Sequence, residues 1–351
     1  MSLLPRLKLD ASPASGTTQV STASDREPAP RLAALLAVAG PTGAGKSSLA
    51  LALAERFNGE IVNFDSVQVY AGFNIGSAKL PLGERRGIAH HLIDLCAPSD
   101  HFTAGDFVAE VQAILPQIAA RGRIPILCGG TGFYLRALLH GLSPGPRRDD
   151  RLRDRLLARE RRRPGAIRRL LQRLDPVSAG RIHPNDANKS TRALELRILA
   201  ARPSAEHFSE AALAPLTGYK SLVLALAPPR EALYKHLNQR CENMWHGGLL
   251  NEVRLLLDAG VSPNAKPFES LGYKQALRYL LNANTAEPEA IEEMKVRTRQ
   301  YAKRQWTWFR AENAVQWISG FGSEQSAQHQ AFEIVAAFLE KSSSPTEHFP
   351  S

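Results

Sequence analysis

The chain has 351 residues, of which 44% are hydrophobic and 22% charged, a composition typical of a globular protein long enough for two domains. Its cysteines, Cys96, Cys128 and Cys241, lie far apart, which argues against a disulfide framework or a cysteine zinc site and fits a reducing cytoplasm. No apolar run approaches the roughly 20 residues of a membrane span, so we expect no membrane partner. The net charge of +10 favours a polyanionic partner.

Residues 1–30 are rich in Ser, Thr, Pro and Ala and show no periodicity, so we expect a disordered tail. Three acids, Asp10, Asp25 and Glu27, argue against a transit peptide, and no apolar stretch is long enough for a secretory signal. These features predict a cytoplasmic protein.

Residues 35–57 carry the motif on which the prediction of function depends. The apolar run 35–39 predicts a buried strand, and 48–57 contain helix formers without Pro or Gly. Between them, a G-x-x-x-x-G-K-S sequence is typical of a phosphate-binding loop (P-loop): Gly40, Pro41, Thr42, Gly43, Ala44, Gly45, Lys46 and Ser47. The glycines let N–H groups turn toward a phosphate, Lys46 supplies positive charge, and Ser47 can ligate Mg²⁺. The motif predicts a di- or triphosphate ligand.

Two further predicted strands end in polar residues. Residues 60–66 form a strand that ends near Asp65, and 123–128 form one that runs into Gly129-Gly130-Thr131-Gly132. Ligands of doubly wound α/β folds collect at the carboxyl ends of strands, so Asp65 should face the phosphate site, either beside Mg²⁺ or in proton chemistry. The glycines before and after Thr131 leave open backbone for a bulky ligand.

The remaining periodic segments complete an α/β pattern with predicted helices at 102–120 and 231–257 and strands at 91–95 and 221–226. We interpret the adjacent His90 and His91 as structural. The pattern predicts a P-loop core like that of nucleotide kinases, with a parallel sheet, formed by 31–142 and 206–320. We expect 321–351 to be peripheral.

A basic helical insertion interrupts this core. Pro144-Gly145-Pro146 marks a boundary, and 143–205 read as helices broken at 163–165. Twelve arginines and four acids fall within 147–173, which fits either a nucleic-acid surface or a solvated helix face. A second basic stretch, 295–310, is interleaved with aromatic residues that could stack on bases or belong to the core.

Ten motifs, in this order, resemble those of the tRNA dimethylallyltransferase (tRNA isopentenyltransferase) family over roughly residues 36–318. They are GPTGAGKS at 40–47, DSVQVY at 65–70, IGSAK at 75–79, HHLID at 90–94, GGTGFY at 129–134, RIHPND at 181–186, RALE at 192–195, GLLNEV at 248–253, LGYK at 271–274 and KRQ at 303–305. Ser77 stands where the family commonly has Thr, and 188–190 are more polar than usual. The zinc finger of eukaryotic members is absent.

The resemblance implies a prenyl transfer that periodicity and spacing do not show. In this family, N6 of the adenosine at tRNA position 37, in tRNAs reading codons that begin with U, attacks C1 of dimethylallyl diphosphate and pyrophosphate leaves. The resemblance implies that Asp65 is the general base and that Thr131 lines the reaction channel. It also implies that Arg240 and Lys46 bind the diphosphate. Growing charge on the leaving group is what Lys46, Mg²⁺ and the loop N–H groups would stabilise.

The resemblance also implies contacts with the tRNA anticodon stem-loop. The implied residues lie in the turn after the second strand, in the insertion and in the C-terminal helices: Asp65, Ser66, Val67, Gln68, Thr131, Arg153, Asn188, Lys189, Ser190, Thr191, Arg192, Leu271, Gly272, Tyr273, Arg299, Gln300, Lys303, Arg304 and Gln305. These contacts favour tRNA binding over a solvated face for the insertion.

Three alternatives compete with this interpretation. A P-loop small-molecule kinase shares the core but does not explain the insertion or Gly129-Gly130-Thr131. An enzyme that prenylates free AMP has little use for a basic insertion. A non-catalytic RNA-binding protein is disfavoured by the intact Lys46, Asp65 and Arg240. We expect the enzyme to be a monomer.

Overall fold

The computed structural model describes residues 32–142, 145–146, 148–200, 215–282 and 284–343. The predicted tail at 1–30 and the end of the predicted insertion at 201–205 lie outside the described residues. In these described ranges, no helix is both long and apolar enough to cross a membrane.

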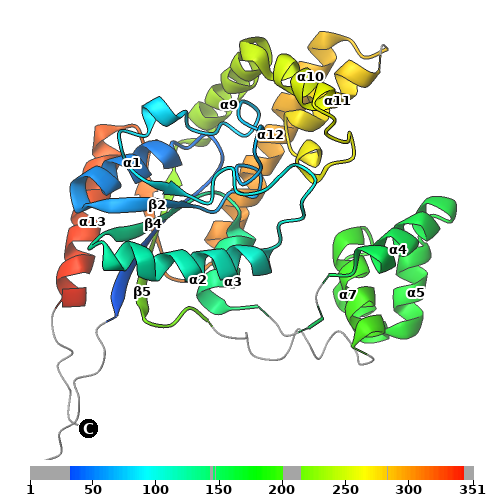
Figure 1. Ribbon diagram of the computed structural model, residues 1–351, viewed down its shortest axis with the longest axis horizontal. Coiled ribbons are helices and arrows are strands. Elements are labelled where there is room, and N and C mark those ends of the chain that lie inside the picture. Colours follow the sequence, from blue (N-terminus) through cyan, green and yellow to red (C-terminus); the bar gives the residue numbers. More distant parts are fainter. Residues whose placement is uncertain (1–31, 143–144, 147, 201–214, 283, 344–351) are drawn as a thin grey trace, which may run out of the picture. The chain divides into compact units, whose positions relative to one another are not determined.

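A parallel six-stranded sheet forms the core, in the order β3-β2-β4-β1-β5-β6 (Figure 1). Its strands are β1 (Ala33–Ala39), β2 (Gly59–Asn63), β3 (His90–His91), β4 (Ile124–Cys128), β5 (Tyr219–Ala227) and β6 (Val315–Ser319). Leu35 and Leu36 in β1 are both 0% exposed, because parallel strands are covered on both faces. The predicted α/β fold with a parallel sheet is confirmed.

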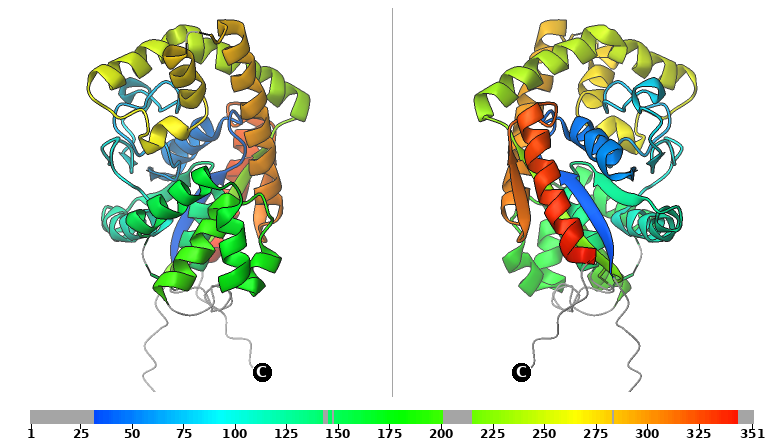
Figure 2. Two further views of the ribbon diagram at one scale, coloured as in Figure 1. Left: turned by 90° about the vertical axis from the view of Figure 1, so that its right-hand side faces the viewer. Right: turned by 90° about the vertical axis from the view of Figure 1, so that its left-hand side faces the viewer.

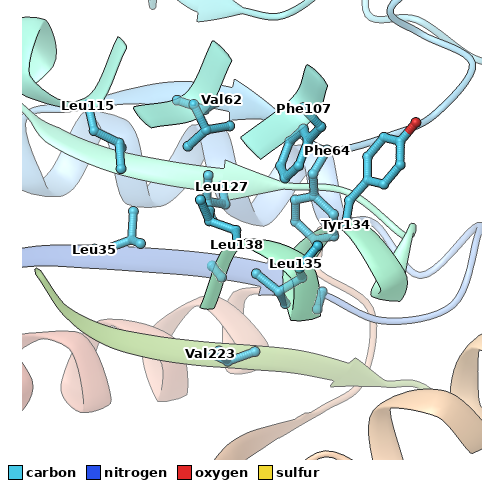
Figure 3. Packing of buried hydrophobic residues seen from close by; sticks show 14 of the residues in the cluster. Leu35, Val62, Phe64, Phe107, Leu115, Leu127, Tyr134, Leu135, Leu138 and Val223 are labelled. Carbon is cyan, nitrogen blue, oxygen red and sulfur yellow. The ribbon is translucent and has the colours of Figure 1, made fainter. Parts of the chain in front are cut away.

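Helices cover both faces of the sheet because successive strand residues point to opposite sides. Leu35 belongs to a cluster with Phe107 of α2 (Ala104–Ala120) and Leu135 of α3 (Gly132–His140) (Figure 3). Its neighbour Leu36 belongs to a second cluster with residues of α1 (Lys46–Phe57) and α13 (Gln325–Ser343).

Helix α13 is part of the core, so the expectation that 321–351 is peripheral is wrong for this helix. Ala327, Ala331 and Val335 are 0% exposed and pack in the cluster of Leu36. Their four-residue spacing places them on one face of the helix, and the small side chains let α13 lie close to β1, β5 and β6 (Figure 2).

The strand predicted at 91–95 is shorter than expected and begins one residue earlier. β3 contains only His90 and His91, because Leu92 and Asp94 adopt φ of 61° and 55°, which turns the chain away from the sheet. His91 Nε2 lies 2.7 Å from Glu60 Oε2, a structural contact in agreement with our interpretation.

Residues 150–199 form the helices α4 (Asp150–Arg162), α5 (Ala166–Leu174), α6 (Pro176–Arg181) and α7 (Ala187–Leu199), which pack on one another (Figure 1). The predicted break at 163–165 is confirmed, and Gly165 with φ of 80° precedes α5. Leu152, Leu156, Leu171 and Leu194 share a separate hydrophobic cluster. The insertion therefore has its own small core.

The remaining helices follow β5 and hold the segment after β2. They are α9 (Arg230–Met244), the π-helical turn η2 (Trp245–Leu249), α10 (Leu250–Asp258), the short 3-10 turn η3 (Lys266–Glu269), α11 (Tyr273–Leu281) and α12 (Glu287–Arg310). A second 3-10 turn, η1 (Leu82–Glu84), lies between β2 and β3. Tyr70 and Phe73 pack in one cluster with Trp245, Tyr273 and Met294. These contacts anchor the chain that leads away from Asp65.

Candidate active site

Three neighbouring strand ends bring the predicted catalytic residues together. Cys128, the last residue of β4, pairs with Val38 of β1 and with Asn63 of β2. The P-loop follows β1, Asp65 follows β2 and Thr131 follows β4. Because all three strands run in the same direction, these segments meet at the carboxyl edge of the sheet.

The P-loop requires glycine for both conformation and space. Gly40, Gly43 and Gly45 have φ of 126°, 76° and 85°, which side chains other than glycine rarely adopt. A Cβ on Gly45 would lie 2.8 Å from the backbone nitrogen of Gly322, which donates to the Ala44 carbonyl at 2.9 Å. The segment before α13 therefore packs against the P-loop at Ala44 and Gly45.

Lys46 opens α1 and lies in an electrostatic environment that favours an anionic ligand. Its Nζ donates to the Pro41 carbonyl oxygen at 2.9 Å. Burial of the ammonium group, with a smaller effect from the charge of Arg240, lowers the pKa of Lys46 from 10.5 to about 8, while Cys128 and Asp65 oppose this shift. A phosphate beside Nζ would favour the charged form.

Arg240 of α9 is a second cation at the same place. It makes no hydrogen bond or ion pair with any residue that the structure describes, although its planar guanidinium carries five N–H donors. Burial lowers the pKa of Arg240, and the charge of Asp65 raises it. Two partly desolvated cations near a single carboxylate indicate a site for an anion with more than one charge.

The Asp65 side chain is held in one orientation by its own turn. Oδ1 accepts hydrogen bonds from the backbone N–H groups of Val67 at 2.8 Å and Gln68 at 3.3 Å. The Asp65 backbone N–H donates to Asn63 Oδ1 at 3.1 Å, and Asn63 Nδ2 donates to the Leu92 carbonyl at 2.9 Å. Within the described residues Oδ2 has no hydrogen-bond partner, so this oxygen can accept a proton from a ligand.

Thr131 connects the loop after β4 to the turn that holds Asp65. Its Oγ1 accepts a hydrogen bond from the Ser66 backbone N–H at 3.2 Å. A hydroxyl that accepts in this way keeps its own hydrogen for donation to a ligand. Thr131 therefore lies beside the turn that holds Asp65.

Helix α12 contributes two residues to the site, Gln305, which sequence analysis assigned to tRNA binding, and Tyr301, which it did not assign. Gln305, a predicted tRNA contact, is 5% exposed, and its side chain bonds to the protein backbone. Burial and the negative charge of Asp65 raise the pKa of Tyr301, which places this tyrosine near the carboxylate. The four-residue spacing of Tyr301 and Gln305 was the available signal, since it puts both on one face of the helix.

Two other predicted tRNA contacts also bind their own protein. Tyr273 is buried, and its hydroxyl donates to Glu252 Oε1 at 2.5 Å and accepts from the Gly76 N–H at 3.1 Å. Gln68 Nε2 donates to the Ser77 carbonyl at 3.1 Å. Both therefore support the 75–79 loop. Among the predicted neighbours, Gly272 is buried and three residues are half-buried: Ser66, Val67 and Leu271.

The predicted tRNA contacts of the insertion divide into buried and exposed residues. Arg153 and Arg192 both bind Glu195, which is 0% exposed; Arg153 makes two bonds to it, at 3.0 and 2.8 Å. Ser190 and Thr191 are 2% and 5% exposed, because α7 turns them inward, so their predicted contact with tRNA has little surface in this structure. Two remain on the surface: Asn188 and Lys189.

Along α12, the predicted contacts other than Gln305 are half-buried or exposed. Arg299 is half-buried and donates to Asn238 Oδ1 at 2.5 Å, with Glu292 3.4 Å away. Gln300, Lys303 and Arg304 are exposed. These side chains project from the helix that carries Tyr301 and Gln305 into the site.

Ser47 is the residue that fits a magnesium ion. It is exposed in the first turn of α1 and offers one hydroxyl oxygen. The described residues contain no group of three or more His, Cys, Asp or Glu side chains that could hold a metal. A single hydroxyl suits Mg²⁺ that takes its other ligands from phosphate oxygens and water.

These features define a P-loop protein of the α/β class with a site suited to a multiply charged anion near a fixed carboxylate. Residues 68–312 match the family model described as IPP transferase. The chain therefore belongs to the IPP transferase family.

Curated relatives and solved structures agree with this assignment. The chain is 54% identical over 305 residues to the tRNA dimethylallyltransferase of Solibacter usitatus, covering 87% of this chain and 99% of the relative. It is 45% identical to that of Koribacter versatilis, covering 86% and 97%. Its fold is similar to the tRNA isopentenylpyrophosphate transferase of Bacillus halodurans (TM-score 0.66, 34% identity, 90% and 99% covered). It is also similar to a eukaryotic dimethylallyltransferase acting on tRNA (TM-score 0.74, 29% identity, 91% and 82% covered).

Proposed function

We propose that the protein transfers a dimethylallyl group from dimethylallyl diphosphate to N6 of the adenosine at tRNA position 37. The observation that carries this proposal is the arrangement of Lys46 and Arg240, two partly desolvated cations, with a carboxylate whose Oδ2 is free among the described residues. The cations suit the diphosphate of the donor, and the carboxylate suits the amine of the acceptor.

The P-loop stabilises the leaving group. As the bond between C1 and the bridging oxygen breaks, negative charge grows on the pyrophosphate. Lys46, Arg240 and N–H groups of the loop would stabilise this charge from positions fixed by the fold, with little reorganisation during the reaction. Mg²⁺ held by Ser47 and the diphosphate would neutralise further charge.

Asp65 acts on the nucleophile. The lone pair of the adenine amine is delocalised into the ring, which makes the amine a weak nucleophile. Oδ2 of Asp65 accepts the N6 proton while the new C–N bond forms at C1, and pyrophosphate leaves with the electron pair of the broken C–O bond. The bonds from Val67 and Gln68 to Oδ1 keep Oδ2 directed to the acceptor.

The exposed cations support a tRNA acceptor over a free nucleotide. Arg155, Arg159, Arg162 and Arg163 surround an open cavity of about 550 Å³ on the insertion. Lys303 and Arg304 are exposed on α12. Such residues neutralise backbone phosphates. The energy needed to flip a base out of its stack is lowest in an unpaired segment such as an anticodon loop.

The test is mass spectrometry of adenosines after incubation of the protein with an anticodon stem-loop, Mg²⁺ and dimethylallyl diphosphate. We expect a prenyl mass on the adenosine 3′ of the anticodon. Parallel reactions contain AMP in place of RNA, or ATP with small-molecule acceptors. Prenylation of AMP alone, or phosphoryl transfer from ATP without prenylation, would replace the proposal with the corresponding alternative.

A further inference from the structure

Gln305 bonds to two loops of the active site that are distant in sequence. Its Oε1 accepts from the Thr42 backbone N–H at 2.8 Å, and its Nε2 donates to the Gly130 carbonyl at 2.8 Å. The first partner belongs to the P-loop and the second to the loop after β4. With 5% exposure, the side chain is held between them.

Helix α12 touches the loop after β4 on both sides of Thr131. A Cβ on Gly130 would lie 2.2 Å from Gln305 Nε2, and one on Gly132 would lie 2.2 Å from the indole of Trp308. A Cβ at either place would force the Gln305 amide or the Trp308 ring to move. The two glycines are therefore needed for close approach of the helix, which explains why the motif is Gly-Thr-Gly at this point.

Trp308 is fixed by packing rather than by a hydrogen bond. Its buried Nε1 has no hydrogen-bond partner in the described part of the chain. The Arg136 guanidinium lies 4.4 Å from the ring centroid and also pairs with Glu312 at 2.6 Å. Trp308 therefore forms a firm wall against Gly132, one helical turn beyond Gln305.

These contacts form a continuous connection between the two halves of the site. Lys46 Nζ lies 3.6 Å from the place of a Cβ on Gly130, so the Gln305 bonds hold Gly130 beside the cation. The next residue, Thr131, bonds to Ser66, the neighbour of Asp65. The position of α12 thus sets the position of the leaving-group cation relative to the base.

We propose that Gln305 is a positioning residue for the transfer reaction, which couples the P-loop to the Thr131 loop, with Trp308 supporting it at Gly132. The inference rests on the proposed function. A misplacement of about 1 Å between reacting groups can lower a rate about 100-fold. Gln305→Met keeps the length of the side chain and removes both hydrogen bonds, so it should lower the single-turnover rate by about 10–100-fold at saturating donor and tRNA. The affinity for tRNA should stay unchanged.

A second readout does not depend on activity. Amide hydrogen exchange reports local opening of each loop. In Gln305→Met, exchange should become faster at 40–44 and 129–132 together. Gln305→Glu keeps the acceptor for Thr42 and loses the donor to Gly130, so exchange should rise at 129–132 alone. The matched control is Thr307→Ala, an exposed residue of α12 whose hydroxyl, among the residues that the structure describes, bonds only to the Lys303 carbonyl of its own helix.

The outcomes separate the possibilities. Parental rates and parental exchange in both Gln305 variants would overturn the inference, as would loss of tRNA affinity with an unchanged single-turnover rate, because Gln305 would then be a tRNA contact. If Gln305→Met does not fold, Gln305→Glu and Gly132→Ala, which displaces Trp308, carry the test. If the parent protein prenylates no RNA, the proposed function fails, while hydrogen exchange still decides whether Gln305 couples the two loops.

Discussion

Lys46 should take up a proton when the donor binds, because the pKa of its ammonium group is lowered to about 8 in the folded protein. At that pKa the free site is about 90% protonated at pH 7, about half at pH 8 and about one tenth at pH 9. A diphosphate beside Nζ favours the charged form, so binding should take up about 0.1, 0.5 and 0.9 protons at these pH values. Donor affinity should fall about tenfold per pH unit well above pH 8.

The assay is calorimetry of donor binding in buffers of different ionisation enthalpy, without tRNA so that no transfer occurs. Lys46→Arg is the matched control, because a guanidinium stays protonated in this range and should show no uptake. Absence of proton uptake in the parent at pH 8–9, or the same uptake in Lys46→Arg, would refute the assignment of Lys46 to the diphosphate.

The same shift has a consequence for stability. The pKa of Lys46 is lower in the folded protein than its ordinary 10.5, so burial of the charged group lowers the free energy of unfolding, with its full effect below pH 8. This loss of stability disappears as the pH rises from 8 through 10.5. Bound diphosphate should remove it at neutral pH, which thermal unfolding with and without donor can measure.

Three further predictions follow from named contacts. Asp65→Asn should lower kcat by about 10²–10⁴-fold with little change in tRNA or donor affinity; an unchanged single-turnover rate with weakened tRNA binding would make Asp65 a recognition residue. Replacing the exposed Arg151 and Arg155 by Ala should lower the slope of log K against log salt for tRNA by about 1.4–1.8, and a parental slope would mark a solvated face. Arg153→Met leaves the buried Glu195 with Arg192 and the Asp149 N–H as its partners and should destabilise the insertion by about 1.5–3 kcal/mol in chemical unfolding; wild-type stability would contradict this role.

Local sequence patterns were sufficient to predict secondary structure wherever it depends on neighbours within a few residues. An apolar run, a glycine-rich turn and a run of helix-forming residues predicted β1, the P-loop and α1 for this reason. Asp65 could be placed at the carboxyl edge for the same reason, since parallel strands all end on one side of the sheet. The break at 163–165 needed only Pro and Gly.

Residues whose partners are distant in sequence could not be assigned in this way. Gln305 stands among cations and was grouped with them, but its partners lie 263 and 175 positions away. Arg153 and Arg151 look alike in the sequence, yet only Arg153 faces the buried Glu195.

The sequence by itself determined which functional segments follow which strands along the chain. They are a phosphate loop, a carboxylate and a Gly-Thr-Gly turn, each at the end of a strand. The tertiary structure alone decided which helix closes the site, and which side chains hold it together rather than face a ligand. Ala327, Ala331 and Val335 recur every four residues, so the sequence contained a buried face for α13. The local pattern did not show which surface this face covers. Packing depends on shape complementarity between segments that are distant in sequence and that meet only as the chain folds.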